Sequence, residues 1–319
     1  MSRRLFDLNV EDVLDNWVAR HAVREVIANA LDEQVITGTA DIQIVEDRRG
    51  AWHIRDFGRG LQIDHFTLNE NEEKLSYASG IIGKFGVGLK DALATFHRRG
   101  VDVLIRSRHG TYRLLKAQKH NFDGIVTLHV EYDDAPTDVS GTEFVLQGVS
   151  DSEMSLAKAL FLRFSDEHVL ETTRYGQVLR GKADGARVYI AGVLASEEPN
   201  FLFSYNVTSL TESMKKRLNR EKLNVGRSTY TERVKTILKH AKSKVIQRLL
   251  IDQIDKRSLG EQCDEMQWIE ISQMALNLLS QRHSVAFVTE GELQAQEEPS
   301  NNYSTGMRSL KWLLHPWNY

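Results

Sequence analysis

The 319-residue chain has little that could stabilise it covalently and nothing long enough to cross a membrane. It contains one cysteine, Cys263, and four prolines. A single cysteine excludes an intramolecular disulfide and a cysteine-based zinc site, which is typical of proteins from a reducing compartment. No apolar run reaches the length of a transmembrane helix, and the first residues lack the apolar segment of a signal peptide. We therefore expect a soluble, cytoplasmic protein with no membrane partner.

Net charge is also low, but its distribution is uneven. The formal charge is −3 at pH 7. Residues 211–250 hold twelve Lys and Arg against three Glu, a local charge of +9, so the remainder of the chain carries −12. Such a basic segment can bind nucleic-acid phosphates, or it can pair with the acidic remainder or with a partner subunit. DNA is therefore one candidate partner through residues 211–250.

Hydrophobic periodicity predicts an α+β sandwich in the first half of the chain. Residues 11–36 are predicted to form a buried helix, 41–56 a hairpin and 86–98 a second helix. Residues 101–146 are predicted to form an antiparallel meander. This order favours a mostly antiparallel sheet with helices on one of its faces.

A smaller α/β unit and a tail are predicted to follow. Strand-like stretches occur at 172–179, 187–193 and 201–207, and a long helix with basic flanks is predicted after Tyr230. Its apolar stripe consists of Val234, Leu238, Ala241, Val245 and Leu249. We expect three parts with boundaries at 1–167, 168–254 and 255–319, the last of them a helical extension and tail.

Two acidic motifs of the first unit have the residue types of a nucleotide site. Glu25 and Asn29 are four residues apart, so they share one face of a largely apolar helix. An amide oxygen suits Mg²⁺, and a carboxylate can take a proton from water. Asp56 directly follows a strand and precedes Gly58 and Gly60, so it could accept a hydrogen bond from an exocyclic amine. Ordinary surface polar residues would explain the first motif equally well, and a plain strand-to-loop turn would explain the second.

Two further motifs lie at a helix start and a strand start. The sequence Gly83-Lys84-Phe85-Gly86-Val87-Gly88-Leu89-Lys90 opens a predicted helix, where free backbone N–H groups can bind an anion. It has neither the Gly-Lys-Ser/Thr ending of a P-loop nor the spacing of a dinucleotide fingerprint. Thr142 follows Ser140-Gly141 at a strand start, where its hydroxyl could reach a base or a water. Neither motif is specific by itself.

Taken together and in this order, the four motifs resemble the GHKL, or Bergerat-fold, ATPase superfamily. That superfamily includes the ATP-binding part of gyrase, the ninety-kilodalton heat-shock chaperones, histidine kinases and MutL. The likeness covers residues 11 to about 150. The loop 82–88 looks most like the chaperone loop, while Gly88-Leu89-Lys90 and residues 60–75 resemble MORC ATPases. The resemblance thus implies a Bergerat-type first unit, closest to the MORC-like, chaperone-like or MutL-like group.

The resemblance also implies a role for each matched position. Glu25 would be the general base that activates water, Asn29 would coordinate Mg²⁺, and Asp56 would bind the adenine amino group. Residues 61–85 would form a lid over ATP. The other implied ATP contacts support the helix, wrap the phosphates or complete the adenine side: Asp32, Gly58, Gly60, Gly83, Lys84, Gly86, Val87, Gly88, Lys90 and Thr142.

The second unit resembles a transducer domain more weakly. In gyrase-type and MutL-type members this domain supplies a cation to the γ-phosphate. Arg220, Lys222 and Arg227 are candidates for that cation, and a solvated basic surface would explain them equally well.

The expected function is therefore a Mg²⁺-dependent ATPase whose lid closure promotes homodimerisation or engagement of a partner subunit. Glu25 favours hydrolysis over the phosphotransfer of histidine kinases. The alternative is an ATP-sensing regulatory module of a larger assembly that hydrolyses little ATP.

Overall fold

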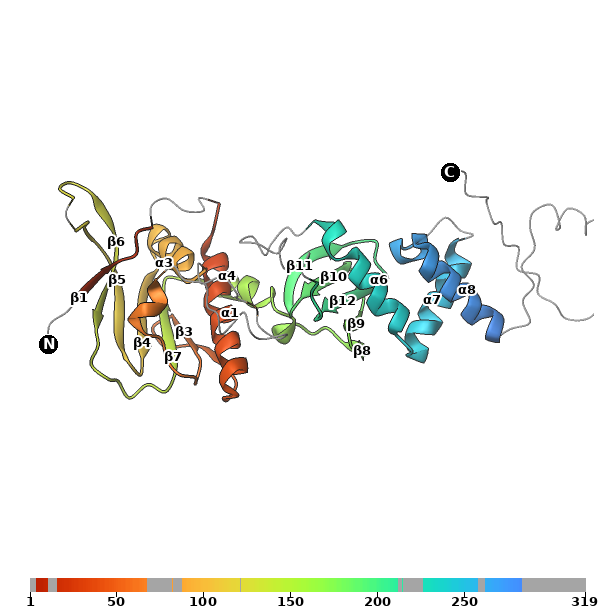
Figure 1. Ribbon diagram of the computed structural model, residues 1–319, viewed down its shortest axis with the longest axis horizontal. Helices are drawn as coiled ribbons and strands as arrows, with labels where there is room; N and C mark the ends of the chain where they lie inside the picture. The colour runs from red at the N-terminus through yellow and green to blue at the C-terminus, as the bar shows by residue number, and fades with distance from the viewer. Residues whose placement is uncertain are drawn as a thin grey trace, which may run out of the picture.

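The computed structural model describes residues 4–10, 16–67, 82, 88–120, 122–211, 214, 226–257 and 262–282. Figure 1 shows a large sheet with its helices at the N-terminal end, a smaller sheet in the middle and two helices at the other end. Two separate clusters of buried apolar side chains form the cores, one for each sheet.

The first unit is built on a seven-stranded sheet in which every neighbouring pair of strands is antiparallel. Its strand order is β1-β6-β5-β4-β7-β3-β2. Helices α1, α3 and α4 all lie on one side of this sheet (Figure 1). The α+β class and the large antiparallel sheet are thus confirmed. The elements are β1 (Arg4–Asp7), α1 (Ala19–Thr37), β2 (Gln43–Glu46), β3 (Ala51–Arg55), η1 (Ile63–Phe66), α3 (Gly88–Arg98), β4 (Asp102–Ser107), β5 (Gly110–Gln118), β6 (Val126–Asp133), β7 (Thr142–Gln147), α4 (Asp151–Lys158) and η2 (Leu162–Phe164).

Helix α1 is the central helix of the first core. Apolar residues surround most of its axis between Ala19 and Leu31, and this stretch is buried almost throughout. The helix ends where Gly38 adopts a left-handed conformation and its N–H bonds to the carbonyl of Gln34. This is the usual C-terminal stop of a helix. The predicted end is therefore confirmed, whereas part of the predicted start, residues 11–15, lies outside the described residues.

The second unit contains a five-stranded sheet of order β11-β10-β12-β9-β8, in which β10 and β12 are parallel. The prediction of one strand at 172–179 was wrong, because the chain reverses at Arg174 and Tyr175 to form a hairpin. The elements are β8 (Val169–Thr173), β9 (Gly176–Arg180), β10 (Ala186–Ile190), β11 (Val193–Glu198), β12 (Phe203–Val207), η3 (Arg227–Thr229), α6 (Thr231–His240), α7 (Lys244–Arg257), η4 (Asp264–Gln267) and α8 (Ile269–Arg282).

The predicted long helix after Tyr230 is broken into α6 and α7, so its continuous apolar stripe was a wrong prediction. The carboxylate of Glu171 accepts backbone N–H bonds from Lys242 and Ser243 at 2.7–2.9 Å. The N–H of Val245 donates to the Ser243 hydroxyl, which begins α7. After this break Val245 is exposed, and Ile246 faces the core in its place.

The two C-terminal helices share the core of the second sheet. Residues of α7 and α8 belong to the same buried cluster as the strands β9, β10 and β12, among them Leu250, Ile254, Ile271 and Ala275. The predicted division after residue 254 falls inside α7, which runs to Arg257. The part of the extension that the structure describes is therefore packed on the second unit.

A short backbone connection joins the two units. The N–H of Leu162 donates to the carbonyl of Gly192, and the N–H of Leu194 donates to that of Leu160, each at 2.8 Å. The side chains of Phe161 and Val193 both belong to the first core. The predicted boundary at 167/168 follows this connection and precedes β8.

Within the described residues, no helix combines the length and apolar character that a bilayer crossing requires.

Candidate functional site

The candidate site begins on helix α1, where Glu25 and Asp32 are buried and Asn29 is half-buried. The Nε and Nη2 atoms of Arg24 donate to Oε1 of Glu25 at 3.0 and 2.6 Å. Arg24 is itself buried, and its Nη1 atom has no hydrogen-bond partner among the described residues. The ion pair fixes the position of the Glu25 carboxylate on α1.

The start of helix α3 lies directly against Glu25. A Cβ atom built on Gly88 would collide with Oε2 of Glu25, so only glycine fits there without moving the carboxylate. The predicted neighbours Glu25 and Gly88, 63 positions apart in the sequence, are therefore brought together. The other predicted residues of this loop lie outside the described residues: Gly83, Lys84, Gly86 and Val87.

Asp32 and Glu33 connect the same helix to two further segments. The N–H of Ile82 donates to Oδ1 of Asp32 at 2.6 Å. Glu33 accepts bonds from the backbone N–H and the Nε of Arg59 at 2.8 and 2.9 Å. Glu33 was not among the predicted site residues, although its spacing of four residues from Asn29 places it on the same helical face.

Asp56 directly follows β3, and it is the residue for which an adenine contact was predicted. Its Oδ1 accepts the N–H of Gly58 at 2.9 Å, and its own N–H donates to the carbonyl of Thr142. Burial raises the pKa of the Asp56 carboxyl to about 6, and the negative charge of Glu33 adds to this rise. The N–H of Gly58 and the hydroxyl of Thr142 oppose the rise in pKa.

Thr142 at the start of β7 completes this side of the site. Its hydroxyl accepts the N–H of Leu61 at 2.9 Å, which folds the loop containing the buried Gly60 back onto the sheet. The preceding Gly141 has a φ of 77°, and a Cβ there would collide with the backbone oxygen of Asp56. The two predicted motifs around Asp56 and Thr142 are therefore in direct contact.

Lys90 makes a contact other than the one that the sequence suggested. Its Nζ atom donates to the carbonyl oxygen of Leu8 at 3.1 Å, just beyond β1. Burial lowers the pKa of this ammonium, and the nearby Asp7 opposes that effect. Lys90 thus holds the N-terminal segment against α3, and no described contact links it to Glu25.

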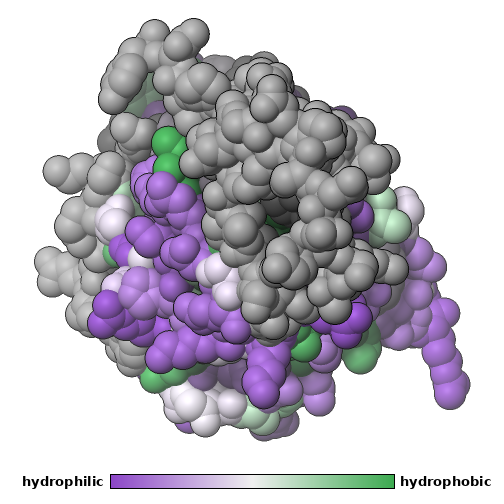
Figure 2. Space-filling model, turned by 90° about the vertical axis from the view of Figure 1, so that its right-hand side faces the viewer, coloured by the Kyte–Doolittle hydropathy of each residue, from purple (hydrophilic) through white to green (hydrophobic). Residues whose placement is uncertain are grey.

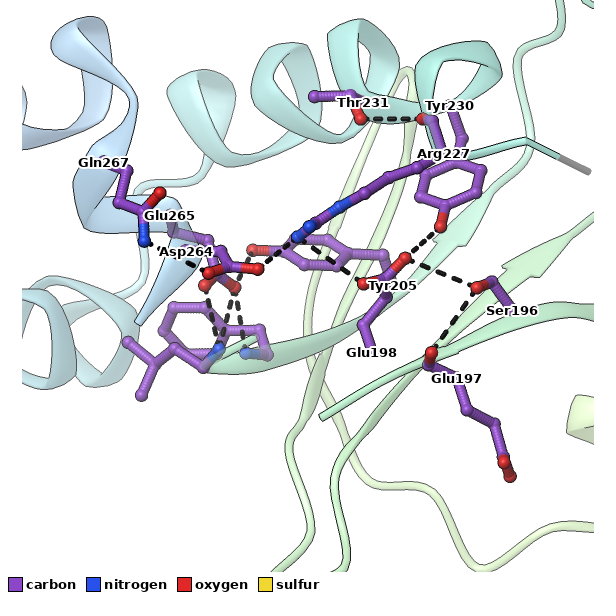
Figure 3. A network of polar contacts seen from close by, with 12 residues as sticks. Ser196, Glu197, Glu198, Tyr205, Arg227, Tyr230, Thr231, Asp264, Glu265 and Gln267 are labelled. Atoms are coloured by element: carbon purple, nitrogen blue, oxygen red, sulfur yellow. Dashed lines mark hydrogen bonds and ion pairs between the residues drawn. The ribbon is translucent and has the colours of Figure 1, made fainter. Parts of the chain in front are cut away.

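Of the three proposed cations of the second unit, Arg227 alone is among the described residues. Arg220 and Lys222 lie outside the described residues. Arg227 forms ion pairs with Asp264 and Glu198, and its guanidinium carbon lies 4.8 Å from the centre of the Phe201 ring. Figure 3 shows Arg227 between these carboxylates, where it joins the start of α6 to η4.

A buried polar network that the sequence analysis missed continues from this point. Glu265 is fully buried and accepts the N–H groups of Leu202 and Phe203 and the hydroxyl of Tyr205 at 2.9–3.2 Å. Tyr230 donates its hydroxyl to Glu198 (Figure 3). Burial raises the pKa of the Glu265 carboxyl, and the N–H groups oppose this. Its donors come from a distant strand, so no local sequence pattern marks it.

The site therefore combines a charge-paired carboxylate, a second carboxylate of raised pKa and a glycine at a helix start. Among the described residues, no three His, Cys, Asp or Glu side chains gather into a metal-binding group. The amide oxygen of Asn29 is the hard ligand nearest in sequence to Glu25 on this face.

Comparison with known proteins shows similarity to mycoplasmal proteins. Residues 152–244 match the family described as the Mycoplasma pneumoniae MPN635 N-terminal domain. An uncharacterized protein of Mycoplasma pneumoniae (strain ATCC 29342 / M129) is 33% identical over 247 residues, which cover 76% of this chain and 99% of that protein. A second uncharacterized protein of that strain is 29% identical over 131 residues, or 40% of this chain and 36% of that protein. The extent of the first match shows that the chain belongs to the same family as that Mycoplasma pneumoniae protein.

Proposed function

We propose that the chain is a Mg²⁺-dependent ATPase of the GHKL type, with a Bergerat-type first unit. The observation that carries the proposal is the convergence on α1 of motifs that lie far apart in the sequence. Glu25 contacts Gly88, Glu33 holds the loop after Asp56, and Asp56 contacts Thr142. A nucleotide bound by all four motifs would require them to lie close together in the fold, as they do.

The residues present fit a purine and its phosphates. Asp56 is 6% exposed and accepts few hydrogen bonds from its own chain, so an exocyclic amine would find an acceptor there. Above pH 6 the carboxylate is ionised and accepts such a bond most strongly. The start of α3 lies next to Glu25 at Gly88, and a helix start favours an anion.

Hydrolysis would depend on Glu25 and Asn29. Glu25 would take a proton from the attacking water, and the Arg24 guanidinium would hold that carboxylate in place. Mg²⁺ held by Asn29 would neutralise negative charge on the phosphates. Gly88 lets the Glu25 carboxylate lie directly against the start of α3.

We further propose that the protein acts in the cytoplasm, and that ATP binding promotes homodimerisation or engagement of a partner subunit. The second unit would act as a transducer-like domain, with Arg220 or Lys222 reaching the γ-phosphate. A regulatory module that binds ATP and barely hydrolyses it is the alternative.

Phosphate release and nucleotide affinity test the proposal on three variants. Glu25→Ala should bind ATP with wild-type affinity and lose at least about 100-fold in turnover, which is the usual contribution of a general base. Asp56→Asn should lose binding. Glu46→Ala removes an exposed carboxylate from β2 and serves as the matched control, with no change in either quantity. Unchanged turnover in Glu25→Ala would exclude it as the base.

A second experiment separates the ATPase from the module. Gly88→Ala adds one methyl group next to Oε2 of Glu25, so it should lower turnover while ATP still binds. Sizing the protein with and without a non-hydrolysable ATP analogue then reports on dimerisation. An ATP-dependent dimer with turnover supports the switch, whereas binding without turnover supports the module.

A further inference from the structure

The end of the second unit carries a group of cations that come from three separate segments. We call it the cation surface. Arg174 belongs to the β8–β9 turn, Lys242 lies between α6 and α7, and the remaining members are on the two helices. The full set is Arg174, Arg233, Lys239, Lys242, Lys244 and Arg248. All but Arg233, which is half-buried, are exposed.

An aromatic ring lies within this group. The guanidinium carbons of Arg174 and Arg233 lie 4.6 and 5.2 Å from the centre of the Tyr175 ring. The ring of His240 meets Tyr175 edge-on at 4.8 Å. The sequence between Arg233 and Arg248 contains no Phe, Tyr or Trp, so the ring is supplied by a hairpin more than fifty residues earlier.

Backbone hydrogen bonds hold the three segments in place. The carbonyl of Tyr175 accepts the N–H groups of Thr208 and Ser209 at 3.2 and 3.1 Å. Glu171, on the strand before the turn, accepts those of Lys242 and Ser243. In Figure 1 the ends of β8 and β9 lie beside the end of α6 and the start of α7. The cation surface is therefore part of the folded unit rather than of a loose segment.

None of the six cations forms an ion pair with another residue in the part of the chain that the structure describes. Other cations of the second unit are paired: Lys182 with Asp166, Arg187 with Glu167, Arg227 with Asp264 and Lys235 with Glu232. Lys235 also lies over the Trp268 ring, so it belongs to a different side of α6 from the cation surface. Glu171 uses its carboxylate on backbone groups and neutralises no side chain.

Arg174 and Arg233 are held around one ring and repel one another, and the negative face of the Tyr175 ring offsets only part of that repulsion. A partner with regularly spaced negative charge would offset the rest. Figure 2, viewed from the α7–α8 end, shows described surface that is mostly hydrophilic, with apolar residues isolated from one another. Val245 is exposed between Lys244 and Arg248, but a membrane would need a continuous apolar face beside the cations, whereas a phosphate backbone needs only the cations.

We propose that the cation surface binds the phosphate backbone of a nucleic acid, without reading its sequence. Arg174 and Arg233 contact phosphates on one side of Tyr175, and Lys242, Lys244 and Arg248 contact those along the start of α7. Arg groups fit phosphate with two parallel bonds, while Lys groups act as point charges. Binding here is independent of the proposed ATP site, which lies in the other unit.

Fluorescence anisotropy with a labelled 30-base-pair DNA duplex tests the proposal on the full chain at several salt concentrations. The triple variant Lys242→Gln, Lys244→Gln, Arg248→Gln should weaken binding at least about tenfold at low salt. It should also reduce the slope of log K against log salt by about 2–3, since each phosphate contact contributes about 0.9. The matched control Arg48→Gln, Arg49→Gln, Lys116→Gln removes three exposed cations from the first unit and should change neither.

Two further measurements keep the test decisive. The Glu25→Ala variant should bind the duplex as the wild type does, so a failure of the ATPase proposal would leave this result intact. Vesicles containing anionic lipid, at matched charge concentration, should bind the wild type far more weakly than the duplex. Three results would overturn the proposal. They are no binding of the duplex at low salt, an equal loss of duplex affinity in both triple variants, and tighter binding of the vesicles than of the duplex.

Discussion

Two buried carboxylates, Asp56 in the first unit and Glu265 in the second, both have a raised pKa but lie in opposite surroundings. Three donors of its own chain converge on Glu265: two backbone N–H groups and the Tyr205 hydroxyl. Asp56 accepts one backbone N–H, with the Thr142 hydroxyl beside it. A buried carboxylate that receives all its hydrogen bonds from the chain stabilises the fold. One with fewer donors lowers the free energy of unfolding, and a ligand that donates the missing bonds can remove this effect.

The largest expected effect is at Glu265. Glu265→Ala leaves the N–H groups of Leu202 and Phe203 and the Tyr205 hydroxyl without their acceptor, so the free energy of unfolding should fall by about 3–5 kcal/mol. Chemical denaturation measures this. Glu270→Ala, an exposed carboxylate in the first turn of α8, should change stability by less than about 0.5 kcal/mol. Equal effects would mean that the network does not stabilise the unit.

Asp56 should behave in the opposite way. Its folded pKa of about 6 lies above the ordinary value of 3.8, so ionisation disfavours the folded state and wild-type stability falls as pH rises from 4 to 6. Asp56→Asn removes this cost, and the variant should be more stable by about 3 kcal/mol at pH 8, since two pKa units correspond to about that free energy. Thermal unfolding at pH 4 and pH 8 checks it. A difference in stability between Asp56→Asn and the wild type that does not grow with pH would contradict the raised pKa.

The same pKa predicts how nucleotide affinity depends on pH. Protonation of Asp56 below pH 6 removes the acceptor for the adenine amine, so ATP affinity should fall as pH decreases through that value. Calorimetric titration between pH 5 and pH 8 measures the change. Guanine nucleotides, which lack this amine, provide the control because they should bind weakly at every pH.

The smallest effect is expected at Glu171, whose half-buried carboxylate lies between these two extremes. Glu171→Gln weakens the bonds to Lys242 and Ser243 without emptying the space, so stability should fall by about 1 kcal/mol. Asp252→Asn changes an exposed carboxylate on α7 and should have no measurable effect. A helix that became continuous through residues 241–243 in the Gln variant, seen as increased helical circular dichroism, would confirm that Glu171 causes the break.

Local patterns predicted the first unit well because its elements follow their own periodicity. Helix α1, the β2–β3 hairpin and the strands β4 to β7 all lie where the sequence placed them. The predicted meander was wrong in its last connection, because β7 crosses over to pair with β4 instead of β6. The short strand β1 was missed, since its four residues gain their structure by pairing with β6 more than 120 positions later. The α6–α7 break was missed for the same reason, because Glu171 lies about 70 residues before it.

The candidate site was predictable where one element carries several of its residues. The spacing of Glu25 and Asn29 on one helix is visible in the sequence, and the structure adds that Asp56 contacts Thr142. The destination of Lys90 was not predictable, because Leu8 approaches it through the tertiary fold. The role of Arg24 was not predictable either, because only the structure shows that its guanidinium donates a hydrogen bond to Glu25.

The backbone connection between residues 160–162 and 192–194 has a mechanical consequence. Two hydrogen bonds and the Phe161 and Val193 side chains anchor β11, an edge strand of the second sheet, in the core beneath α4. Helix α4 contacts α1, the helix that carries Glu25. A displacement of α1 would therefore be transmitted through α4 to β11 at the edge of the second sheet. The connection therefore gives a continuous path of packed residues from the helix that carries Glu25 to the sheet of the second unit.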